Sequence, residues 1–142
     1  MNGSSNLCFA LEDGAFLPKR AHNLDAGLDL MTPIDFDVPA HGFRFVDTGV
    51  HVELPDGTDG HIRSKSGLNR YYGLTVDGTV DEGYSGTIGV TIHNHSDQKV
   101  YFTRGEKIAQ LVIEPILRPT VVLRDRVQSG PRGEGGYGST GA

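Results

Sequence analysis

The sequence lacks the features that mark secreted and membrane-bound chains. Its 142 residues include one cysteine, Cys8, which excludes an internal disulfide. The amino terminus has neither a charged region nor a long apolar run, so the sequence predicts no signal peptide and no membrane span. Because disulfides and leader peptides belong to exported chains, we expect a cytoplasmic protein with no membrane partner.

Clusters of basic residues are lacking as well. The formal net charge is -5, and lysine and arginine nowhere form a block. This charge argues against broad binding to nucleic acid or to an anionic membrane. Any phosphate group that the protein binds must therefore be held locally, by a few side chains.

Helical periodicity is nearly absent, and apolar residues mostly recur at every second position. Glycine or proline interrupts nearly every interval of about ten residues, a rhythm that is typical of β-sandwiches and closed barrels. The sequence therefore predicts an all-β fold. Strands are expected within residues 43–55, with a turn at Thr48 and Gly49, and within residues 87–94, 100–105, 108–116 and 120–127.

One helix is expected, and it is short. Residues 64–73 offer Ser64 or Ser66 as an N-cap and Gly73 as a C-terminal stop, although a loop is the alternative interpretation. No repeat or linker divides residues 1–128, which are expected to form one body. The last 14 residues, 129–142, include six glycines, so this tail is either disordered or ordered by a ligand.

Residues 77–86, with the sequence DGTVDEGYSG, place two acids and a tyrosine between two predicted strands. One interpretation is an ordinary hairpin with glycines in its turn. The other is an active-site hairpin, in which exposed backbone groups read the edge of a base and a carboxylate at the rim takes a proton from water. Tyr84 could then present its ring to a sugar.

Two further polar positions are ambiguous. Asp29 lies between two leucines at the start of a predicted strand, which is a common place for a turn residue. Gln110 is a lone polar residue in an apolar run, so its amide needs either a backbone group or a phosphate oxygen as a partner. His93, His95 and Asp97 are interpreted as a polar turn rather than a metal site.

Five short motifs follow one another along nearly the whole chain. They are AGLDL at residues 26–30, SKSGL at 64–68, GTVDEGYSG at 78–86, RGEKIAQL at 104–111 and RGEGGYGST at 132–140. In order and spacing the set resembles the five motifs of the trimeric dUTPase family. The resemblance implies a jelly-roll-like β-barrel or sandwich, a homotrimer whose active sites are shared between subunits, and hydrolysis of dUTP to dUMP and pyrophosphate.

The resemblance also implies roles for single residues. Asp81 would hold and deprotonate the water that attacks the α-phosphorus, and Asp29 would reach a Mg2+ cofactor through a water molecule. Tyr84 would lie under the deoxyribose, and residues 129–142 would form a mobile arm that closes over the nucleotide. The other residues implied in substrate binding are Lys65, Ser66, Gly67, Thr75, Thr79, Val80, Gly89, Gln110, Arg132, Tyr137, Gly138, Ser139 and Thr140.

Some positions depart from the family pattern. Lys65 stands where the family usually has arginine, so either Lys65 or Arg63 is expected to fill that role. The asparagine often seen in the uracil hairpin is missing, which leaves Thr75 or the backbone alone to read the base. dCTP deaminases share the fold, but Thr91 stands where their catalytic glutamate falls. A nucleotide-binding regulatory protein on the same fold remains the main alternative.

Overall fold

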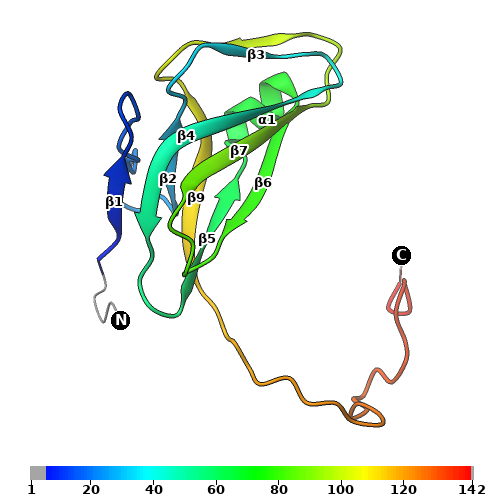
Figure 1. The fold of residues 1–142 in the computed structure, drawn as a ribbon. Helices are drawn as coiled ribbons and strands as arrows, with labels where there is room; N and C mark the ends of the chain where they lie inside the picture. Colours follow the sequence, from blue (N-terminus) through cyan, green and yellow to red (C-terminus); the bar gives the residue numbers. More distant parts are fainter. Residues whose placement is uncertain (1–5, 142) are drawn as a thin grey trace.

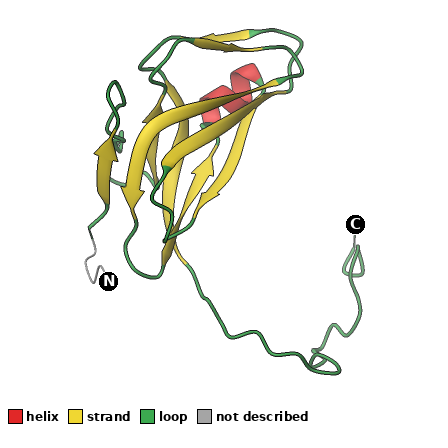
Figure 2. Ribbon diagram, viewed as in Figure 1, coloured by secondary structure: helices red, strands yellow, loops and turns green. Residues whose placement is uncertain are grey.

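The computed structural model describes residues 6–141 (Figure 1). Strands dominate the described residues, and the expected all-β fold is confirmed (Figure 2). The elements are β1 (Cys8–Leu11), β2 (Gly27–Met31), β3 (Phe36–Val38), β4 (Phe43–Glu53), β5 (Thr58–Arg63), α1 (Ser66–Tyr72), β6 (Leu74–Val80), β7 (Thr87–Asn94), β8 (Val100–Phe102) and β9 (Lys107–Pro115).

Seven strands form one sheet in the order β1-β4-β7-β6-β5-β9-β2, and each neighbouring pair is antiparallel. The sheet curls around the core, while β3 and β8 form a second, two-stranded sheet that lies over the end near α1 (Figure 1). Curling lets one sheet cover both sides of its own core, so the body needs no helical layer.

The core is built by alternating residues of the long strands. In β4 the buried positions are Val46, Thr48, Val50 and Val52. The buried Thr48 hydroxyl is satisfied because it donates a hydrogen bond to the Ile88 carbonyl at 2.7 Å. Further core members are Leu30, Ile62, Leu74, Val90, Ile92, Ile108 and Leu111.

The turn expected at Thr48 and Gly49 is wrong, because β4 continues through both residues. The register with β7 shifts between Asp47 and His51, and Gly49 has a φ of 69°. Glycine adopts this left-handed conformation with little steric strain, because it has no Cβ. The glycine that suggested a turn in the sequence therefore marks a β-bulge within the strand.

The expected helix is present as α1, and Gly73 ends it in the left-handed conformation with a φ of 67°. The expected N-cap is wrong, because the N-cap residue is Lys65 and makes no side-chain capping bond. The Ser64 hydroxyl instead exchanges hydrogen bonds with the backbone of Val76 on β6. Within residues 6–141, no helix has the length and apolar character needed to cross a bilayer.

The chain leaves the body at the end of β9 and runs away from it as an extended segment (Figure 1). The strand expected at residues 120–127 is wrong, because this stretch has no strand assignment and all of it is exposed. Val121 and Leu123 are 95% and 96% exposed. Their alternation predicts a strand, but this segment pairs with no strand of the described body.

Candidate active site

A cavity opens where the two strands of the β6–β7 hairpin separate. β6 pairs with β7 from Leu74 to Val76, and beyond that point it pairs with β5 while β7 pairs with β4. The resulting cavity has a volume of about 290 Å³. Five of the expected site residues line it, namely Thr79, Val80, Asp81, Tyr84 and Gly89, together with Phe45, Ile62, Thr87 and Ile88.

The loop between β6 and β7 holds Tyr84 across the mouth of the hairpin. The Tyr84 amide donates to the Asp81 carbonyl at 3.0 Å, and the Tyr84 hydroxyl donates to the Thr87 carbonyl at 2.8 Å. A Cβ at Gly86 would lie 2.3 Å from the Tyr84 hydroxyl oxygen, so this ring position requires glycine there. The segment is therefore both a glycine-turned hairpin and the wall of a cavity.

The two acids of this loop have different environments. Glu82 accepts hydrogen bonds from the Gly57 amide at 2.8 Å and from Arg118 at 3.2 Å. The Gly57 amide, helped by Arg118, lowers the pKa of Glu82 against the opposing effect of burial. Asp81 is exposed at the cavity rim, and its carboxylate has no hydrogen-bond or ion-pair partner among residues 6–141. Asp81 is thus available to accept a proton, whereas Glu82 holds the loop in place.

Two residues that contact the β6–β7 hairpin, Phe45 and His51, were not singled out from the sequence. A Cβ at Gly89 would lie 2.4 Å from the Phe45 ring, so this ring closes over the backbone of Gly89. His51 bonds to the Ser85 carbonyl and to Glu12, both at 2.8 Å, and these two partners raise the pKa of the imidazole. Both residues lie on β4, far from the hairpin in sequence, so only the strand pairing identifies them.

A second cluster surrounds Asp29 on β2. The carboxylate is 4% exposed and receives hydrogen bonds from the ammonium groups of Lys65 and Lys107, the latter at 3.1 Å. Burial raises the pKa of the Asp29 carboxyl, but the two lysines outweigh it and hold the pKa below its usual value. The cluster therefore keeps an ionised carboxylate inside a net-positive site.

Gln110 lies beside this cluster on β9, directly opposite Asp29. Its amide nitrogen donates to the Ser64 carbonyl at 2.9 Å, which positions the loop that leads into Ser66 and Gly67. A Cβ at Gly27 would lie 2.2 Å from the Gln110 amide oxygen, so Gly27 makes room for this side chain. Three of the expected motifs thus meet at one place.

The cavity and the lysine cluster are far apart within one chain. One row of register pairs crosses the sheet through Asp77↔Arg63, Arg63↔Gln110 and Gln110↔Asp29. Asp81 lies four residues beyond the start of this row, which spans three strand spacings, so the path along the curled sheet from Asp81 to Asp29 is about 20 Å.

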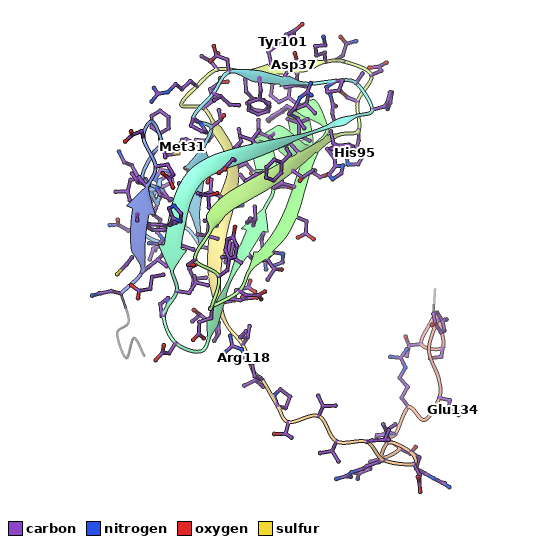
Figure 3. All side chains as sticks on the ribbon, viewed as in Figure 1. Met31, Asp37, His95, Tyr101, Arg118 and Glu134 are labelled. Atoms are coloured by element: carbon purple, nitrogen blue, oxygen red, sulfur yellow. The ribbon has the colours of Figure 1, made fainter. Side chains whose placement is uncertain are left out.

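Thr75 lies away from the residues that line the cavity between β6 and β7. It lies near the opposite end of β6, and its hydroxyl is 2.7 Å from His95 Nε2. In Figure 3, His95 lies in the upper part of the body, whereas Arg118, which contacts the Asp81–Glu82 loop, lies at its lower end. Thr75 is therefore separate from the cavity of its own chain, and the expectation that Thr75 or the backbone alone reads the base stays a prediction.

The dUTPase family model matches residues 13–141. The chain belongs to the dUTPase family. The deoxyuridine 5'-triphosphate nucleotidohydrolase of Gloeothece citriformis (strain PCC 7424) is 46% identical over 134 residues, covering 92% of this chain and 92% of that protein. The enzyme of the same name from Arabidopsis thaliana is 40% identical over 132 residues, covering 92% of this chain and 80% of that protein.

Solved dUTPase structures share the fold. The dUTPase of Staphylococcus bacteriophage 80alpha with dUPNHPP has a TM-score of 0.91 at 28% identity, covering 98% of this chain and 100% of that chain. A mutant dUTPase of phage phi11 of S. aureus, described with a structural Mg(II) ion, has a TM-score of 0.79 at 26% identity over 85% of this chain and 97% of that one. The expected dUTPase-like, jelly-roll-like fold is confirmed.

Within this dUTPase family member, the geometry separates Lys65 from Arg63. Lys65 contacts Asp29 in the cluster, while Arg63 pairs with Glu114 and approaches His61. The arm residues lie outside both clusters, and Tyr137 is fully exposed (Figure 1). Within residues 6–141, no group of three or more His, Cys, Asp or Glu side chains is placed to hold a metal ion.

Proposed function

We propose that the protein hydrolyses dUTP to dUMP and pyrophosphate, and thereby keeps uracil out of DNA and supplies dUMP for thymidylate synthesis. The observation that carries the proposal is the cavity between β6 and β7, whose rim presents the Asp81 carboxylate. Membership of the dUTPase family and the names of the curated relatives support it.

In this proposal the base enters the gap between the separated strands. The backbone of Thr79, Val80 and Gly89 faces the base edge, and the Tyr84 ring lies under the deoxyribose, where it leaves little room for a ribose 2'-hydroxyl. Asp81 accepts a proton from the water that attacks the α-phosphorus, which is general-base catalysis by a positioned carboxylate. Pyrophosphate is the leaving group.

The lysine cluster binds the phosphates. Lys65, Ser66, Gly67 and Gln110 position the triphosphate and neutralise its charge, which is most of what phosphoryl transfer requires from a protein. Asp29 fits a contact to Mg2+ through water, because both of its oxygens already accept from lysines and Mg2+ is usually held by phosphates and waters. When bound, the metal neutralises charge that develops on the phosphates.

The complete site is assembled from a homotrimer. A path of about 20 Å along the curled sheet from Asp81 to Asp29 is compatible with a base bound to one chain and phosphates bound to another. Residues 129–142 of a third chain would close over the nucleotide, with Tyr137 stacked on uracil and Arg132 paired with the γ-phosphate. Gly138, Ser139 and Thr140 would contact the phosphates through backbone groups.

The test is pyrophosphate release from dUTP with Mg2+, with dCTP, dTTP and UTP in parallel. We expect release from dUTP alone. Asp81→Asn should lower kcat by about 10²- to 10⁴-fold while the Kd for dUPNHPP stays within about threefold, since a general base contributes to the reaction and little to binding. Asp77→Asn changes an exposed carboxylate on β6, four residues before Asp81, and is the matched control that should keep kcat.

The outcomes separate the candidate functions. Tight dUTP binding without pyrophosphate release from the native chain would contradict hydrolysis and favour a regulatory nucleotide-binding protein. Ammonia release from dCTP would indicate a deaminase. Mixing Asp81→Asn chains with chains truncated after Arg118 tests the shared site, because mixed trimers would combine an intact Asp81 with an intact arm and regain activity.

A further inference from the structure

Lys107 occupies an unusual position for a surface lysine of a strand. Its ammonium group lies 3.1 Å from one oxygen of Asp29, while Lys65 holds the other oxygen. Asp29 is nearly fully buried, whereas the Lys107 side chain is 53% exposed and that of Lys65 is 29% exposed. One buried carboxylate thus has two cations, which is one more than its own charge requires.

A β-bulge aims Lys107 at Asp29. Gln110 stands opposite Asp29 and Lys107 stands opposite Met31, although Lys107 and Gln110 are three positions apart on β9 whereas Met31 and Asp29 are two positions apart on β2. The register shift between Leu30 and Met31 absorbs the extra residue, and Ile108 and Ala109 are consequently both buried. In an unbulged strand Lys107 and Gln110 would face opposite sides of the sheet. The bulge therefore brings the lysine to the phosphate-binding side.

We propose that Lys107 is a positioning residue that keeps Asp29 neutralised and so leaves Lys65 free to move from Asp29 to a phosphate of the nucleotide. This inference rests on the proposed function of the cluster. A buried carboxylate that loses its last cation is strongly destabilised, because nothing compensates its desolvation. With Lys107 present, Lys65 can leave without creating such a charge. Without Lys107, Asp29 would retain Lys65 and compete with the substrate for it.

The proposal assigns different roles to the two lysines. Lys65 precedes Ser66 and Gly67 in the loop that is proposed to contact phosphate, so it touches the substrate. Lys107 starts β9 and acts through Asp29. Removing the Lys107 charge should therefore weaken binding of a triphosphate and leave the chemical step nearly unchanged.

The experiment compares Lys107→Gln and Lys107→Arg with the native chain, and uses Lys99→Gln as a matched control on an exposed lysine outside the site. The Kd for dUPNHPP with Mg2+ is measured by calorimetry, and kcat and KM are measured for dUTP. We expect Lys107→Gln to raise Kd and KM about tenfold, which is about 1.4 kcal/mol, with kcat within about threefold. Lys107→Arg and Lys99→Gln should remain near the native values.

A double variant tests whether Lys107 acts on nucleotide binding through Asp29. In Asp29→Asn the carboxylate charge is absent, so adding Lys107→Gln should change the Kd less than twofold. A tenfold loss that persists in the Asp29→Asn background would overturn the proposal, because it would mean that Lys107 contacts the phosphates directly. Equal Kd values for Lys107→Gln and the native chain would also overturn it.

Failure of the inference and failure of the proposed function give different results. If the native chain releases no pyrophosphate from dUTP, the function is wrong whatever Lys107 does. If the native chain turns over dUTP and Lys107→Gln binds dUPNHPP normally, only the role of Lys107 is wrong. Melting temperatures of all variants show whether folding is affected, and Lys107→Met replaces Lys107→Gln if the amide variant is unstable.

Discussion

Gly27→Ala tests the lysine cluster without touching a charge. Gly27 begins β2, is buried, and lies diagonally across the β2–β9 pair from Gln110. A Cβ added there would be 2.2 Å from the Gln110 amide oxygen and 3.0 Å from both Cβ and Cδ of the same side chain. Gln110 must therefore rotate away, and its 2.9 Å hydrogen bond to the Ser64 carbonyl is lost.

The magnitude follows from these two losses. Overpacking of this kind costs about 1–3 kcal/mol, and a lost hydrogen bond costs about 0.5–1.5 kcal/mol. Gln110 is only half-buried and can relax toward solvent, so we expect a total loss of about 1–3 kcal/mol in the free energy of unfolding. The loop that carries Ser66 and Gly67 loses its tie to β9, so a triphosphate should bind about tenfold more weakly.

The assay combines chemical unfolding with calorimetric binding of dUPNHPP and dUMP. Gly27→Ala should raise the Kd for dUPNHPP and leave the Kd for dUMP within about threefold, because the path along the sheet from Gln110 to the cavity at Asp81 is about 20 Å. Leu24→Ala is the control, since this side chain is 99% exposed and belongs to neither cluster. Native stability together with native dUPNHPP affinity in Gly27→Ala would refute the reasoning. An equal rise in the Kd values for both ligands would refute the claim that the lysine cluster and the Asp81 cavity bind different parts of the nucleotide.

Three further predictions address the helix end, the arm and the effect of pH. Gly73→Ala should lower the free energy of unfolding by about 1 kcal/mol in urea titrations, because a φ of 67° is strained for alanine. Truncation after Arg118 should leave the cooperative melting transition in place, since residues 119–135 are exposed, but should abolish pyrophosphate release. His51 has a pKa raised by Glu12 and the Ser85 carbonyl, so its stabilisation is fully present below the unfolded value of 6.5 and is lost as pH rises through the folded value. His51→Gln should therefore destabilise the protein more at about pH 5.5 than at about pH 9 in urea titrations, and an equal loss at both pH values would contradict this assignment.

Local signals in the sequence predicted local structure well. The glycines and the flanking alternation placed the β6–β7 hairpin, and Gly73 marked the end of α1. Contacts between residues on distant strands could not be predicted from the sequence in the same way. Phe45 covers Gly89 because β4 pairs with β7, and Lys107 reaches Asp29 because β9 bulges against β2. Register between distant strands decides both contacts, and a single sequence does not specify it.

The wrong predictions share a physical cause. Ser64 has a good capping side chain, but β6 offers its hydroxyl two backbone partners at Val76, so tertiary bonding overrides the local preference. Residues 120–127 alternate like a strand, yet a strand needs a neighbour to pair with, and the segment lies away from the body (Figure 1). Propensity describes what a segment can form, while the available partners decide what it does form.

The same segment bears on the proposed homotrimer. Val121 and Leu123 are apolar and almost fully exposed, and they precede the arm that the proposed mechanism places at another chain's cavity. An isolated chain gains nothing from exposing them, because burying each would stabilise the protein by about 1.5–3 kcal/mol. Their alternating pattern is therefore better explained by pairing or packing against a neighbouring subunit than by any contact within the chain. In the proposed homotrimer, the exposed arm and the two separate clusters of different chains would meet at one site, and this arrangement would explain why neither cluster is complete within a single chain.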